Sequence, residues 1–291
     1  MNKTNILCCI LFLCLQLQTS NAQQQNTRLW VLKKSGFTDS YIYLTGPACG
    51  TAITVTPELQ RVIAQVKTIA VEVDLYSPEA RKIAAYNYAN EEKDKIKNNL
   101  SNADFSKLFN ILKEHGYPDN AINTLFVYRI PVAYIILSSA LNNCGNSGQT
   151  VYETEFKKLA TKNKLKYHVL CSVDSVIAQM NIHTNNYWVT NINAVVNAPD
   201  AFKEALRQES ELYKADNFIS LATLYKQNEF FIKRFNDNFL LMHSRLLSKS
   251  ILEEAKEGPV LFTIDITNII TSNSGLFDML EKNGFEVKPA F

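Results

Sequence analysis

The chain has 291 residues, of which 46% are apolar and 11% aromatic, an ordinary composition for a globular protein that predicts one domain of generous size. Its formal net charge of +2 gives no basis for binding nucleic acid or an anionic membrane surface. The mixed charges are instead expected to form a solvated surface, so the sequence must be interpreted from its elements and motifs.

The N-terminus has the pattern of a cleaved signal peptide. Lys3 supplies a small positive region, residues 6–17 are apolar, and residues 20–22 form a small-x-small cleavage site. Cys14 raises lipid attachment as an alternative, but the three residues before it lack the small side chain that this requires. We therefore expect cleavage near Ala22 and export to the periplasm or the exterior. No later stretch reaches the roughly 18 uninterrupted apolar residues of a membrane span.

Export would leave three cysteines in the mature chain of residues 23–291: Cys49, Cys144 and Cys171. In an oxidising compartment this odd number is compatible with one disulfide and one free thiol. Three free, buried cysteines are the alternative, and the residues alone leave both open.

The first half of the predicted sheet begins with two strands, at residues 29–32 and 41–45, joined as a hairpin with a long loop. Gly46 and Pro47 then form a sharp turn. A helix is expected from Thr56 onward, since threonine is a good N-cap and proline follows it at the first helical position.

Residues 68–74 form an apolar run that predicts a buried strand, and Glu72 lies within that run. A buried carboxylate is costly unless it is paired or bound to a cation. Glu72 is therefore a candidate functional residue, although it could also lie near the end of the strand and be solvated.

From residue 77 to about 249 the pattern changes to helices, with a short strand expected at 167–170 and one long helix at 230–247. The closing segment returns to a strand at 260–266, a turn-rich loop at 268–275, a helix at 276–282 and a last strand at 285–287. The predicted fold class is α/β: sheet-forming N- and C-terminal segments with a helical insertion between them.

Three separated stretches together resemble the TraB/GumN family, which includes the Tiki-type membrane-tethered proteases. They run from Leu29 to Asp74, from Lys233 to Phe239, where the family has an Arg-Asn-x-x-Trp signature, and from Val260 to Val287. The order and spacing of these stretches carry the resemblance, which spans almost the whole mature chain. It implies the TraB/GumN fold and a crevice at the carboxyl ends of the strands.

Members of that family carry two GxxH motifs and a glutamate that are thought to hold a divalent metal for peptide-bond cleavage. This chain matches the first glycine with Gly46 and the glutamate with Glu72, but Cys49 replaces the first histidine and Asn268 the second. The resemblance therefore implies degenerate metal-ligand positions at Cys49, Glu72 and Asn268. A carboxamide binds zinc or manganese weakly, whereas a thiolate remains a strong soft ligand.

In the middle signature Asn236 matches the family asparagine, and Arg234 lies one position before the family arginine. The resemblance implies that Glu72 and Asn236 occupy catalytic positions. If no metal holds Glu72, we expect a cation such as Arg234 to do so. The four histidines lie outside the motifs and are expected to be ordinary surface or core residues: His115, His168, His183 and His243.

Loss of both motif histidines favours a catalytically degenerate homologue that binds a peptide or protein and needs no cofactor. The alternative is a metal-dependent peptidase or hydrolase in which Cys49 and Glu72 survive as ligands of zinc or manganese. Neither function can be assigned from fold resemblance alone, because one fold carries many functions.

The resemblance also suggests a disulfide between Cys49 and Cys171, because Cys171 stands where the family's internal strand usually ends in glutamate. A two-thiolate site for a soft metal is a variant of this hypothesis. Pairing of Cys171 with Cys144 is its main rival.

Overall fold

A computed structural model describes residues 26–49, 53–74, 77–89, 91–142, 144, 151–234, 237–270 and 275–291. The predicted signal peptide at residues 1–22 lies outside these ranges, as does Asn236. Arg234 is described as part of a helix, but the position of its side chain is not. None of the described helices is long and apolar enough to cross a membrane.

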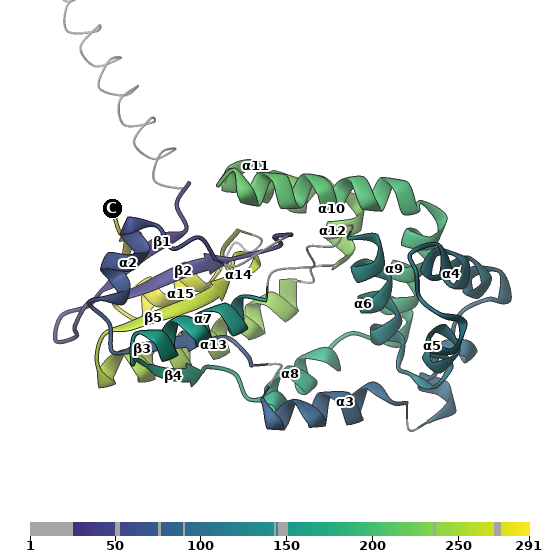
Figure 1. The fold of residues 1–291 in the computed structure, drawn as a ribbon, viewed down its shortest axis with the longest axis horizontal. Coiled ribbons are helices and arrows are strands. Elements are labelled where there is room, and N and C mark those ends of the chain that lie inside the picture. The colour runs from purple at the N-terminus through teal and green to yellow at the C-terminus, as the bar shows by residue number, and fades with distance from the viewer. Residues whose placement is uncertain are drawn as a thin grey trace, which may run out of the picture.

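The chain forms one six-stranded sheet in the order β4-β3-β5-β2-β1-β6 (Figure 1). The central strands β2, β5, β3 and β4 are all parallel, and β1 pairs antiparallel with β2 and with β6. The strands span β1 Leu29–Lys33, β2 Ser40–Thr45, β3 Thr68–Val71, β4 Lys166–Val169, β5 Val260–Asp265 and β6 Glu286–Pro289. The predicted α/β class and the opening hairpin are confirmed.

Helices cover both faces of the sheet, which explains why β2 and β3 are buried along their whole length. On one face, α2 (Pro57–Ile63) and α7 (Tyr152–Lys162) pack through residues such as Leu59 and Phe156. On the other, α13 (Asp237–Glu257) and α15 (Leu276–Lys282) pack through residues such as Leu247 and Leu280. Alternate residues of each strand therefore enter different cores.

The helical part of the molecule lies to one side of the sheet, with α10 and α11 passing above it in Figure 1. Its helices span α3 Arg81–Asn87, α4 Asn102–Glu114, α5 Asp119–Thr124, α6 Ile130–Leu141, α8 Val173–Met180, α9 Asn185–Asn197, α10 Pro199–Lys214, α11 Phe218–Gln227 and α12 Glu229–Arg234. The short strand expected at 167–170 is confirmed as β4, which joins the sheet, and the neighbouring helix α7 packs on the sheet.

The helix expected at 230–247 corresponds to α12 and α13, and residues 235–236 between them lie outside the described ranges. Two local predictions need correction. The loop expected at 268–275 starts as a short helix, α14 (Thr267–Ile270), because the Asp265 carboxylate caps it by accepting from the Thr267 N–H at 2.9 Å. The strand expected at 68–74 ends at Val71, so Glu72 follows the strand rather than lying inside it.

Candidate functional site at the carboxyl edge of the sheet

Parallel pairing brings the carboxyl ends of four strands to one edge of the sheet. Thr45 of β2 is paired with Asp265 of β5, and the Ile266 N–H continues the ladder to the Thr45 carbonyl at 2.8 Å. On the other side of β5, the Cys171 N–H donates to the Glu72 carbonyl at 2.8 Å. The edge therefore collects residues that lie far apart in the sequence, as expected for the ligand crevice of an open α/β sheet.

Glu72 is held by protein groups on both carboxylate oxygens. Its Oε1 accepts from the Asp265 backbone N–H at 2.8 Å and from the Asn268 side-chain amide at 3.0 Å. Its Oε2 lies 3.5 Å from Nε2 of His243 on α13. The side chain is only 17% exposed, so these contacts compensate a carboxylate that is largely removed from water.

His243 is the functional candidate that the sequence did not reveal. Burial by itself lowers the pKa of the imidazole, but the hydrogen bond and the charge of Glu72, with a smaller contribution from Asp265, raise it overall above the ordinary value. The predicted cation was Arg234, whose side chain lies outside the described residues. In the sequence His243 follows Asn236 of the middle signature by seven residues, and this spacing is a signal that could have pointed to it.

Asn268 reaches the site as predicted, but its amide nitrogen faces Glu72. The residue is 2% exposed, and within the described structure its Oδ1 has no hydrogen-bond partner. An unsatisfied buried acceptor costs free energy, so a hydrogen-bond donor placed beside this oxygen would be favourable.

Further carboxylates surround this position. Burial raises the pKa of Glu153 on α7, and the nearby charges of Glu72, Asp265 and Asp74 raise it further. Asp74 is compensated by Lys157, whose Nζ lies 3.0 Å from it. The crevice consequently has acidic and carbonyl acceptors that suit a ligand with N–H donors.

Gly46 is required at the end of β2 because an aromatic ring occupies the space of a side chain. A Cβ at this position would lie 2.6 Å from two ring carbons of Tyr213. The Tyr213 hydroxyl donates to the Leu44 carbonyl at 3.0 Å and accepts from the Tyr152 hydroxyl at 2.9 Å. Burial raises the pKa of Tyr152 to about 12, so both hydroxyls remain protonated at neutral pH.

The cysteines pair differently from either predicted arrangement. Cys49 is disulfide-bonded to Cys144, with their Cα atoms 4.9 Å apart, and Cys171 is a free, buried thiol. Sheet order explains the error: Cys49 follows β2 and Cys171 follows β4, and two strands, β5 and β3, lie between them. Three interstrand steps amount to about 14 Å, twice the roughly 7 Å that a disulfide allows.

The free thiol is also unsuited to act as a thiolate. Burial, followed by the charge of Glu72, raises the pKa of Cys171 to about 12. Across the described ranges, no group of three or more histidine, cysteine, aspartate or glutamate residues is placed to hold a metal ion.

Together, the six-stranded sheet and the residues gathered at its carboxyl edge define an α/β protein with a candidate site where the parallel strands end. The family model of the TraB/PrgY/gumN family matches residues 28–289, nearly the whole chain. The chain belongs to this family, as the motif order predicted. Searches of curated proteins and of solved structures find no match.

Proposed function

We propose that this protein is a catalytically degenerate member of the TraB/PrgY/gumN family that binds a peptide or protein at the carboxyl edge of its sheet. The observation that carries the proposal is the state of Glu72. Its carboxylate, at the position where the family is thought to bind metal, is engaged by the Asp265 N–H, the Asn268 amide and His243.

The remaining donors do not fit a catalytic divalent metal. Such a site needs several unengaged donors and an open coordination position. Here the Cys49 sulfur is bonded to Cys144, and Asn268 turns its nitrogen toward Glu72 rather than offering its oxygen to the same point. His243 stands beside Glu72, and its raised pKa favours the protonated imidazole that pairs with this carboxylate, in the role expected of a cation.

Two features support a peptide as the ligand. Among the described residues the buried Asn268 Oδ1 has no hydrogen-bond donor, and the partly buried Glu153 adds a carboxylate near the same edge of the sheet. Peptide N–H groups and basic side chains are the donors that complement them.

We also propose that the protein is exported after cleavage near Ala22. The Cys49–Cys144 disulfide supports export, because disulfides persist mainly in oxidising compartments.

A peptide-display selection on the purified protein tests the binding function. Selected peptides should bind the wild type and Glu286→Gln, an exposed control on the edge strand β6, but lose affinity at least about tenfold in Glu153→Gln, as expected for a lost charge-assisted contact. The same peptides should remain uncleaved with or without added zinc or manganese. Peptides that bind all three proteins equally would contradict the placement of the site, and metal-dependent cleavage would establish the hydrolase alternative.

A further inference from the structure

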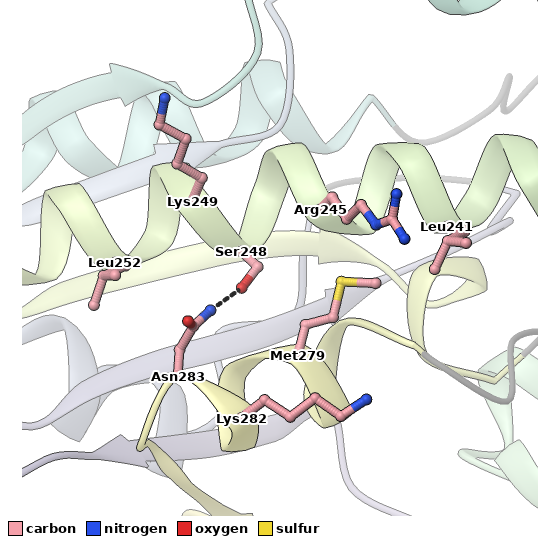
Figure 2. A pocket seen from close by; sticks show the side chains of 8 residues that line it. All are labelled: Leu241, Arg245, Ser248, Lys249, Leu252, Met279, Lys282 and Asn283. Atoms are coloured by element: carbon pink, nitrogen blue, oxygen red, sulfur yellow. Dashed lines mark hydrogen bonds between the residues drawn. The ribbon is translucent and has the colours of Figure 1, made fainter.

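A cationic groove lies between α13 and α15, and its position separates it from the carboxyl-edge crevice. It encloses about 520 Å³ and is lined from both helices (Figure 2). Arg245 is two residues from His243 on α13, and two helical steps of about 100° turn a side chain to nearly the opposite side of the helix. One helix thus presents His243 to Glu72 and Arg245 to the groove.

The lining combines three cations with three apolar side chains. Arg245, Lys249 and Lys282 supply the positive charge, and the described residues that line the groove include no carboxylate; the apolar residues are Leu241, Leu252 and Met279. In the part of the chain that the structure describes, none of the three cations forms an ion pair with an acidic residue. The positive charge of this lining is therefore not balanced by an acidic side chain in this part of the protein, and an anionic ligand would balance it.

The base of the groove is fixed by a hydrogen bond between the two helices. The Asn283 amide donates to the Ser248 hydroxyl at 2.9 Å, and Ser248 is almost fully buried. Figure 2 shows this pair between the helices, with Met279 beside Arg245 and with Lys249 and Lys282 extending away on opposite sides. The hydrogen bond holds the two helices together at this point, and the groove beside it has an apolar wall and cationic rims.

We propose that this groove binds a small amphiphilic anion, a carboxylate or phosphate group joined to a short hydrocarbon chain. The volume falls in the range typical of small-molecule sites, about 300–1,000 Å³. The Arg245 guanidinium can bind a carboxylate or phosphate in a bidentate manner, while Leu241, Leu252 and Met279 contact the hydrocarbon.

Calorimetric titration of the purified protein with octanoate, octyl phosphate and octylammonium tests this proposal. Either anion should bind saturably, the tighter one identifying the headgroup, and octylammonium should not. Arg245→Gln should weaken anion binding at least about tenfold. The control Lys256→Gln removes one charge from an exposed position of the same helix outside the groove and should bind normally.

Methyl NMR of labelled methionines locates the ligand independently. Octanoate should shift the Met279 methyl resonance and leave that of Met180, on α8, unchanged. Equal binding of octanoate and octylammonium would overturn the proposal. An equal loss of octanoate affinity in Arg245→Gln and in Lys256→Gln would also overturn it. A pentaglutamate peptide that binds more tightly than either anion, with the same dependence on Arg245, would assign the groove to an acidic protein partner and overturn it as well.

Discussion

At the scale of single residues, the Glu72–His243 contact decides how the site is interpreted. Glu72 could be identified from the sequence because an acidic residue in an apolar run demands a partner. His243 could not, because it lies on a helix 171 positions further along the chain and its role depends on how α13 packs on the sheet. Only the fold shows that the imidazole of His243 lies beside Glu72, at the position where an arginine or a metal ion was expected.

Replacing His243 with glutamine should destabilise the protein in a pH-dependent way. The folded-state pKa of His243 is raised, so its contribution is complete below the unfolded value near 6.5 and is lost as the pH rises through the folded pKa. The loss should be about 1–3 kcal/mol at pH 6 and smaller at pH 9. Thermal unfolding of wild type and variant at both pH values measures this difference.

His115→Gln is the matched control, because His115 is exposed and lies at the C-cap of α4, 128 residues before His243 in the chain. A difference between wild type and His243→Gln that grows with pH would show that the imidazole is not the charge partner of Glu72.

Glu153→Gln should stabilise the protein at neutral pH, whereas His243→Gln should destabilise it. The pKa of Glu153 is raised by burial and by neighbouring carboxylates, so its ionisation costs stability as the pH rises. Because the side chain is only partly buried, the variant should gain on the order of 1 kcal/mol or less at pH 7, and this gain should vanish near pH 4. Chemical denaturation at the two pH values provides the measurement, and a loss of stability at pH 7 would refute the assigned repulsion.

At the scale of elements, the strands and their shared carboxyl edge were predictable from the sequence. The contacts that residues at the strand ends make with distant helices were not. Hydrophobic runs located β2, β3 and β5, and parallel order placed Gly46, Glu72 and Asn268 at one edge. The sequence did not show that Tyr213 of α10 fills the space beside Gly46, because that contact joins residues 167 positions apart. It also missed α14, whose Asp265 cap resembles an ordinary turn.

Gly46→Ala should destabilise the protein by about 1–3 kcal/mol, since the new methyl group meets the fully buried Tyr213 ring at 2.6 Å. The cost should be much smaller in a Tyr213→Ala background, where the ring is absent. A double-mutant cycle by urea denaturation measures this coupling. Additive effects of the two substitutions would mean that the glycine is needed for another reason.

At the scale of the whole molecule, the Cys49–Cys144 disulfide joins the sheet to the helical part of the chain. Cys49 follows β2, and Cys144 lies three residues after the end of α6. The sequence could not predict this pairing, because the number of strands between two cysteines and the reach of a loop are properties of the assembled fold.

Breaking the disulfide should cost about 2–5 kcal/mol, given the 95-residue separation of its cysteines. Cys144→Ser should lower the thermal midpoint, and a reducing agent should then have no further effect. Cys171→Ala is the control, because reduction should still lower its midpoint. Peptide mapping of the oxidised protein should show a Cys49–Cys144 linked pair, and a linked Cys49–Cys171 pair would contradict the fold itself.

The central claim is that protein groups, rather than a metal ion, hold Glu72 at the family site. Elemental analysis of the purified protein after dialysis against equimolar zinc and manganese tests it most directly. The structure predicts far less than one equivalent of either metal per chain, with the same result for Glu72→Gln and the exposed control Glu286→Gln. One equivalent in the wild type and in Glu286→Gln, lost in Glu72→Gln, would contradict the claim.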